Sequence, residues 1–133
     1  MILYFKKERD REFFDTCERL RKEGLSLEEA AKSAITLPAT SFFLTDKGFE
    51  RIINHTGNVN GIKCELYKEI KDRANKIQCK TVKQTIRILE TQTAPRFYIS
   101  ESRAISLYYE LIKQYRDEVR CRINFYNRVF NGF

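Results

Sequence analysis

The sequence predicts a mainly α-helical domain of five to six helices with two or three very short extended segments and a long C-terminal helix. Three observations carry this prediction. Apolar residues recur every three or four positions, the chain has only 2 Pro and 5 Gly, and hydroxyl residues stand where they can cap helices. The length of 133 residues suits one domain, so we expect residues 1–133 to form a single domain.

The first two helices are predicted from apolar spacing and from a capping box. Residues 6–23 form a charged segment with helical apolar spacing, and Gly24 follows it as a suitable C-terminal stop. Ser26 and Glu29 form the S-x-x-E pattern that starts the second helix. Pro38 ends that helix, because proline disfavours helical backbone in the residue before it.

Three short apolar segments are predicted to be extended: residues 1–5, 41–44 and 97–99. The second and third segments each lead into a helix, and Thr45 and Ser100 stand at the two helix starts. A hydroxyl oxygen at this position accepts a hydrogen bond from a free N–H of the first turn. The two segments could therefore pair with each other while each opens a helix.

Two stretches 55 residues apart share one pattern. Residues 39–46 and 94–101 both read small residue, two variable positions, Phe, aromatic, branched aliphatic, hydroxyl, acid. Each follows a predicted helix and opens another. We therefore expect an internal duplication, with repeat units of about 26–60 and 80–115 related by pseudo-twofold symmetry. Chance similarity over eight positions is the alternative.

The second half of the chain carries three further apolar stripes, in residues 62–77, 81–90 and 100–130. The last stripe predicts a helical rod of roughly 45 Å, at ~1.5 Å per residue, which is longer than a domain of this size is wide. We therefore expect part of it to pack on another molecule. A homo-oligomer formed through the C-terminal helix is the simplest candidate.

The basic residues are concentrated after residue 60. The chain has 25 Lys and Arg against 18 Asp and Glu, a net charge of +7. Residues 1–60 hold 10 basic and 10 acidic side chains, whereas residues 61–133 hold 15 and 8. The loop at 54–61 separates the two parts. Such an asymmetry of charge favours a polyanionic partner, in the first place nucleic acid and in the second an anionic membrane surface. The alternative is that the basic helices serve only to keep the protein soluble.

One candidate row of cations lies on the helix that begins at Thr81. Lys80, Lys83 and Arg87 fall on one helical face, and Lys76 extends this face if the two neighbouring helices are nearly continuous. The opposite, buried face is expected to hold Val82, Ile86 and Leu89. Cations about 5–6 Å apart suit the ~7 Å spacing of phosphates along a nucleic-acid strand.

A second row of cations lies on the last helix and consists of Lys113, Arg116 and Arg120. Tyr109 lies beside this row, and the carboxylate of Asp117 partly neutralises its charge. Arg96 precedes the capped N-terminus of the same helix, where backbone N–H groups also favour anions. The candidate nucleic-acid-binding residues are therefore Lys76, Lys80, Lys83, Arg87, Arg96, Lys113, Arg116 and Arg120. The structural alternative for all of them is a solvated helix face.

The sequence offers little for catalysis, and we expect neither an enzyme nor a bound cofactor. No glycine-rich phosphate loop is present, and His55, the single histidine, stands in a loop where we expect it to be exposed. The acids between Glu8 and Asp15 alternate with basic residues, which favours a salt-bridged surface over a metal site. No two of the four cysteines are within four residues of each other, so we expect reduced thiols and no metal. They are Cys17, Cys64, Cys79 and Cys121.

Residues 94–100, Ala-Pro-Arg-Phe-Tyr-Ile-Ser, followed by Glu101 and Ala104, resemble a motif in small proteins of Bacteroidota phages and mobile elements. The resemblance covers about a tenth of the chain. The first copy of the pattern departs from it, with Thr40 and Ser41 in place of proline and arginine. The resemblance implies a phage or mobile-element setting and assigns no activity.

These observations favour a small basic helical protein that binds nucleic acid, as an accessory or regulatory factor of a phage or mobile element. The gap of ten residues between Glu90 and Glu101 is too long for a helix-turn-helix, so we expect sequence-independent contacts to the backbone of DNA or RNA. The alternative is a helical protein–protein interaction or assembly protein without a nucleic-acid role. No signal peptide or membrane-length apolar run is present, so we expect a cytoplasmic protein without a membrane partner.

Overall fold

The computed structural model describes residues 5–130, with side chains up to Glu118 and at Cys121. It confirms a mainly helical fold with a long C-terminal helix. The described helices are α1 (Lys6–Lys22), α2 (Leu27–Ala34), α3 (Asp46–Ile53), α4 (Ile62–Lys76), α5 (Val82–Glu90) and α6 (Glu101–Phe130). Most of the strand expected at residues 1–5 lies outside the described residues.

Hydroxyl caps start four of these helices, and three of them, at Ser26, Thr45 and Ser100, are those that the sequence predicts. The Ser26 hydroxyl accepts a hydrogen bond from the Glu29 N–H at 3.3 Å, and the Glu29 carboxylate accepts one from the Ser26 N–H at 3.4 Å. The hydroxyls of Thr45, Thr81 and Ser100 each accept from the N–H three residues later, at 3.2, 3.2 and 3.4 Å. Each cap satisfies an N–H that has no partner inside its own helix.

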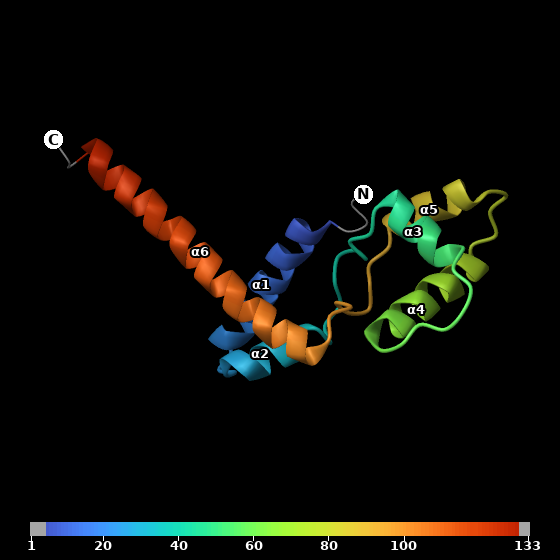
Figure 1. Cartoon of the computed structure of the whole chain (residues 1–133), viewed down its shortest axis with the longest axis horizontal. Helices are drawn as coiled ribbons and strands as arrows, with labels where there is room; N and C mark the ends of the chain where they lie inside the picture. Colours follow the sequence, from blue (N-terminus) through green and yellow to red (C-terminus); the bar gives the residue numbers. More distant parts are fainter. Residues whose placement is uncertain (1–4, 131–133) are drawn as a thin grey trace.

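The helices form two groups of three that lie side by side (Figure 1). Helices α1, α2 and α6 pack on one another, and helices α3, α4 and α5 pack on one another. Each group therefore takes two helices from one half of the chain and one helix from the other half. Residues 35–45 and 91–100 cross between the groups, and we call them the first and second crossing segments.

The crossing segments touch through one antiparallel pair. The N–H groups of Ala39 and Ala94 each donate to the other residue's carbonyl, at 3.0 Å. The Phe97 N–H also donates to the Ile35 carbonyl at 3.2 Å, and in the described residues the predicted strands are reduced to the single bridge between Ala39 and Ala94.

Two pairs of aromatic rings hold the crossing segments together after this bridge. Phe42 and Tyr98 stack with ring centroids 6.1 Å apart and an angle of 18° between the planes. Phe43 and Phe97 stack at 6.2 Å and 7°. Phe42 and Phe97 are buried, whereas Phe43 and Tyr98 are half-buried and face the surface of the junction.

The offset of 55 residues reappears in the structure. Helices α2 and α5 begin 55 residues apart, and so do α3 and α6. The burial pattern of residues 39–44 is repeated in residues 94–99, and Ala39 is paired with its own counterpart, Ala94. Helices α1 and α4 hold equivalent places as well, which extends the correspondence beyond the expected units 26–60 and 80–115. An ancestral duplication stays a prediction.

Buried side chains from both groups form a single hydrophobic cluster. On one side, Phe13 of α1 contacts the rings of Phe97 and Tyr108 edge-on, with centroids 5.9 and 6.4 Å apart. Phe13 and Tyr108 are fully buried, so the second crossing segment is anchored against α1 and α6. Burying aromatic rings in this way supplies much of the hydrophobic stabilisation at the junction.

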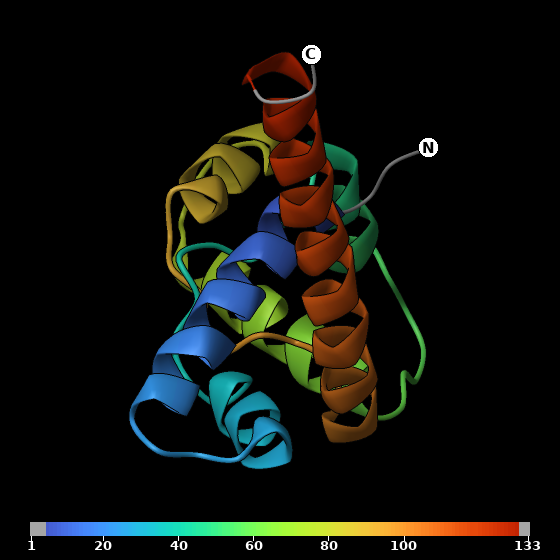
Figure 2. The same cartoon turned by 90° about the vertical axis from the view of Figure 1, so that its left-hand side faces the viewer.

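Helix α6 continues far past the helices that support it. Its last described contact with α1 joins the rings of Tyr115 and Phe14, 4.6 Å apart. Beyond Glu118 the helix continues to Phe130, and no other described element lies beside it (Figures 1 and 2). None of the helices in the described range has a stretch long and apolar enough to cross a membrane.

Candidate nucleic-acid interface

Lys80, Lys83 and Arg87 lie in and just before α5, and all three are exposed. Lys83 and Arg87 are one turn apart on the helix, and Lys80 lies in the loop before the Thr81 cap. Within the described part of the chain, none of these three cations takes part in an ion pair. Glu90, three residues after Arg87, is the one acidic residue of α5, and no ion pair joins the two in the described structure.

The buried face of α5 differs from the predicted one at its first residue. Thr85, Ile86 and Leu89 are buried, with 8%, 6% and 0% exposure, whereas Val82 is 43% exposed. The prediction that Val82 belongs to the buried face was wrong. Val82 lies on the same side as Ile86 but at the end of the helix, and spacing alone cannot tell whether a neighbouring element reaches a helix end.

Lys76 does not extend this face along a continuous helix. Helix α4 ends at Lys76, Ile77 adopts an extended backbone with ψ of 108°, and residues 77–81 separate the two helices. Helices α4 and α5 pack against each other, so the chain reverses here. Lys76 is exposed and borders this turn. It is therefore the turn, and not a shared helical face, that relates Lys76 to Lys80.

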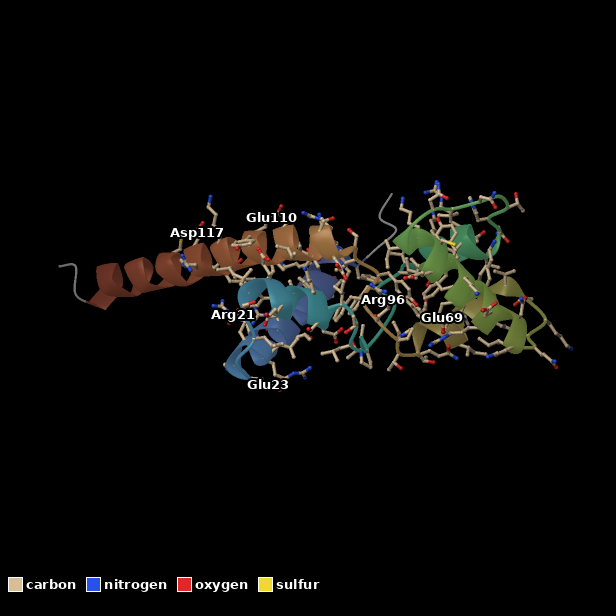
Figure 3. The ribbon with its side chains drawn as sticks, turned by 90° about the horizontal axis from the view of Figure 1, so that it is seen from below. Arg21, Glu23, Glu69, Arg96, Glu110 and Asp117 are labelled. Atoms are coloured by element: carbon tan, nitrogen blue, oxygen red, sulfur yellow. The ribbon has the colours of Figure 1, made fainter. Side chains whose placement is uncertain are left out.

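The second candidate row, on α6, is partly neutralised. Lys113 and Arg116 are exposed, and the side chain of Arg120 lies outside the described residues. Lys113 precedes Asp117 by four residues on the helix, whereas Glu110, three residues before Lys113, pairs with Arg103 at 3.1 Å. Glu110 borders a pocket that Lys6, Lys7 and Asp10 of α1 also line, whereas Asp117 lies on the side of α6 that faces away from α1 and α2 (Figure 3).

Arg96 belongs to the junction between the two helix groups (Figure 3). Its guanidinium makes an ion pair with Glu65 at 3.2 Å, donates a hydrogen bond from Nε to the Phe97 carbonyl, and lies 6.0 Å from the ring centroid of Tyr98. The side chain is 27% exposed. These contacts orient Arg96 within the molecule, and they place it far from a shared row with the α5 cations.

The structure thus separates the two candidate rows. Helix α5 belongs to the group with α3 and α4, whereas α6 belongs to the group with α1 and α2 (Figure 1). The two rows do not form one surface. We call Lys76, Lys80, Lys83 and Arg87 the α5 basic surface, because from Lys76 to Leu89 the chain has these four cations and no acidic residue.

Arg73 has an organising role that the sequence did not reveal. From α4 it makes an ion pair with Glu69 at 2.7 Å and donates to the Gln92 side chain at 3.2 Å and the Thr93 carbonyl at 2.8 Å. Its guanidinium also lies 4.9 Å from the ring centroid of Phe42. Arg73 therefore ties α4 to both crossing segments. Only the Glu69 contact, four residues away, has a signal in the sequence.

Three groups, of which Cys17 and Tyr108 are buried and Tyr98 is half-buried, have pKa values raised by the fold. Burial first, and then the hydrogen bond that its hydroxyl donates to Glu18, raise the pKa of Tyr108 to about 12. Burial, followed by the nearby charge of Glu69, raises the pKa of Tyr98 to about 12. Burial and then the charge of Glu18 raise the pKa of Cys17 to about 12. All three groups are therefore neutral at pH 7.

Three of the acidic residues between Glu8 and Asp15 are engaged with other groups. Asp10 pairs with Arg9 at 3.0 Å, Asp15 pairs with Arg11 at 3.5 Å, and the Glu12 carboxylate accepts a backbone N–H of the first crossing segment at 3.2 Å. In the described ranges, no group of three His, Cys, Asp or Glu side chains is placed to hold a metal ion.

His55 is half-buried, so the expectation of an exposed loop histidine was wrong. Its ring meets the ring of Tyr67 edge-on, with centroids 5.2 Å apart, and its carbonyl accepts a hydrogen bond from Lys71 at 2.6 Å. Nε2 is buried without a hydrogen-bond partner among the described residues. The turn after α3 folds back onto α4, which the local sequence did not indicate.

Comparisons with protein-family models, with curated proteins and with solved structures each found no match to this chain. The resemblance to phage and mobile-element proteins therefore stays a prediction, and the functional proposals below rest on the geometry and charge of this molecule.

Proposed function

We propose that this protein binds nucleic acid through the α5 basic surface and contacts the phosphate backbone. The observation that carries the proposal is that residues 76–89 contain four cations and no acidic residue. Three of these cations, Lys80, Lys83 and Arg87, are exposed in and just before α5 and form no ion pair in the described structure. Uncompensated cations on one surface attract phosphates and release counterions when they bind.

The arrangement suits contacts that do not depend on sequence. Lys83 and Arg87 are about 5–6 Å apart along the helix, close to the spacing of neighbouring phosphates. Phosphate contacts fix position on a nucleic acid and do not read its bases. In the setting that the Ala94–Ser100 motif resembles, the protein would serve in the cytoplasm as an accessory or regulatory factor of a phage or mobile element.

Binding to labelled duplex DNA and duplex RNA of equal length, followed by fluorescence anisotropy over a salt series, tests the proposal. We expect log K to fall linearly with log salt, with a slope of about −0.9 for each neutralised phosphate. The triple variant Lys80→Glu, Lys83→Glu, Arg87→Glu should lose this binding and keep its helical circular dichroism.

The matched control reverses three exposed cations on the other helix group, Arg19, Lys22 and Lys32, also to Glu. It changes the net charge by the same amount and should retain most of the affinity. An equal loss in both triple variants, or no binding at about 50 mM salt where phosphate contacts are strongest, would contradict a specific role for the α5 basic surface.

We propose self-association through α6 as a second function, because α6 continues for a further 12 residues after Glu118 with no described element beside it. In the sequence, the apolar spacing that packs α6 onto α1 and α2 continues through this part of the helix. It does so at Val119, Ile123, Tyr126 and Phe130. A second copy of the chain would supply the missing partner for this stripe.

Light scattering coupled to size-exclusion chromatography tests this proposal. We expect a dimer or larger oligomer that Val119→Asp together with Ile123→Asp converts to a monomer, because charges in an apolar helix interface are costly. The control Cys121→Asp together with Asn124→Asp adds the same charge on the other side of the helix and should leave the oligomer intact. A wild-type monomer at high protein concentration would refute self-association.

A further inference from the structure

A cavity of about 240 Å³ opens at the junction of the two helix groups. The half-buried rings of Phe43 and Tyr98 line it, together with the charged side chains of Arg9, Lys63 and Arg96. It brings together α1, the start of α4 and both crossing segments, which are distant in the sequence. The cavity therefore exists only in the folded molecule.

The charge of this cavity favours an anion. Three cations line it and no carboxylate does. Arg9 pairs with Asp10 and Arg96 pairs with Glu65, and both pairs hold the guanidinium groups in place. Lys63 is exposed and forms no ion pair in the part of the chain that the structure describes. Its positive charge is therefore available to a bound ligand.

The walls of the cavity favour a flat ring. Phe43 is stacked on Phe97, and Tyr98 is stacked on Phe42. In each stacked pair one ring is buried, and the other, Phe43 or Tyr98, is half-buried. The part of the Phe43 ring that faces the cavity can stack with a nucleobase, whereas the ring of Tyr98, over which Arg96 lies 6.0 Å from the centroid, can border the base. Phe43 has a positive φ of 56°, which is unfavourable for a bulky side chain.

Two hydrogen bonds hold the backbone at Phe43. The Ser41 hydroxyl accepts from the Phe43 N–H at 2.9 Å, and the Phe43 carbonyl accepts from the Phe5 N–H at 2.8 Å. These hydrogen bonds keep the Phe43 ring at the cavity although its backbone conformation is strained. Strained backbone of this kind often occurs at ligand sites.

We propose that this cavity binds a nucleotide, with the base against Phe43 and Tyr98 and the phosphate at Lys63 and Arg96. Its volume of about 240 Å³ is below the roughly 300–1,000 Å³ of pockets that enclose a drug-sized ligand, so the base would lie inside and the phosphate at the rim. The nucleotide is either a free mononucleotide or one residue of a single strand. The site is separate from the α5 basic surface, because Lys63 and Lys76 lie at opposite ends of α4, about 20 Å apart.

Titration of the ¹⁵N-labelled protein with adenosine 5′-monophosphate, followed by amide chemical shifts, tests the site. We expect shifts in the two crossing segments and at the start of α4, with much weaker binding of adenosine and of inorganic phosphate. No shift at the junction, or equal affinity for phosphate alone, would overturn the proposal. A short oligodeoxyadenylate that binds more tightly than the mononucleotide identifies a single strand as the source, and equal affinity identifies the free nucleotide.

Lys63→Glu and Lys68→Glu form a matched pair, since both lysines are exposed on α4 and only Lys63 lines the cavity. We expect Lys63→Glu to weaken mononucleotide binding by about tenfold or more, which corresponds to about 1.4 kcal/mol, and Lys68→Glu to leave it unchanged. Equal effects of the two changes would overturn the assignment.

Two further variants separate this proposal from the others. Phe43→Leu should weaken mononucleotide binding but not the weak binding of phosphate, because it removes the ring and keeps an apolar side chain. The Glu variant of Lys80, Lys83 and Arg87 should bind the mononucleotide as the wild type does. Failure of duplex binding and failure of nucleotide binding are then distinguishable.

Discussion

Two arginines act as structural residues in this basic protein. Arg73 and Arg96 are half-buried, each pairs with a glutamate on α4, and each lies over an aromatic ring of a crossing segment. The planar guanidinium can make an ion pair and a ring contact at the same time, which lysine cannot do equally well. A residue count therefore overstates the unpaired positive charge of the protein, and the exposed lysines and Arg87 carry the proposal for the α5 basic surface.

The raised pKa values of buried groups predict a loss of stability at high pH. The fold raises the pKa of Cys17 from 9.0 to about 12, and those of Tyr98 and Tyr108 from 10.0 to about 12. As pH rises through this range, the unfolded chain releases protons that the folded chain retains, so unfolding becomes more favourable. The stability that these groups contribute is complete below pH 9 and is lost on the way to pH 12.

Urea unfolding at a series of pH values measures this effect as the free energy of unfolding. We expect it to fall from about pH 9 in the wild type and from about pH 10 in Cys17→Ala, because the tyrosines alone remain to titrate. A free energy of unfolding that stays level from pH 9 to pH 12 would show that the three groups are not held neutral by burial.

At the scale of the helices, the local sequence is a good guide to where each helix begins. The capping hydroxyls of Ser26, Thr45 and Ser100 were predicted, since each acts on an N–H within the next turn, and Thr81 was predicted as a helix start. The relation between neighbouring helices was harder to predict. The break at residues 77–81 removes the continuous face that Lys76 was expected to extend, and Val82 is exposed because no neighbour covers the helix start.

For the candidate site, too, the sequence predicted the features that lie within one helix and missed those that join distant segments. Lys83 and Arg87 share an exposed face, as their spacing within one helix indicates. Arg96 could not be assigned from its position before a helix, because its partner Glu65 is 31 residues away. The cavity that brings Arg9 to Lys63 and Arg96 has no signal in the local sequence, since it is formed by segments from both halves of the chain.

At the scale of the whole molecule, the junction holds the two helix groups together. Phe97 contacts both sides of it: its ring meets Phe13 of α1 edge-on at 5.9 Å and stacks on Phe43 of the other crossing segment at 6.2 Å. The side chain is 2% exposed. The two groups share one hydrophobic cluster through such residues, so we expect the molecule to unfold as one unit.

Phe97→Ala should therefore lower the free energy of unfolding by about 3–5 kcal/mol, the range for removing a buried phenylalanine ring. The control Phe5→Ala removes a ring that is 50% exposed and keeps its backbone hydrogen bond to Phe43, so it should cost much less. Chemical unfolding followed by circular dichroism measures both. A similar small loss in the two variants would mean that the junction does not couple the groups.

The sequence by itself determined the helical class, the helix starts, the two aromatic segments and the exposed cations of α5, because caps, apolar spacing and charge rows depend on residues within a few positions of one another. Only the tertiary structure decided that α6 packs with α1 and α2, while α3 packs with α4 and α5. It also decided that the two cation rows lie on different helix groups, and that a cavity lined by cations and aromatic rings forms between the crossing segments. These features join residues from opposite halves of the chain. Their free energy comes from burying one surface against another, which no single segment carries alone.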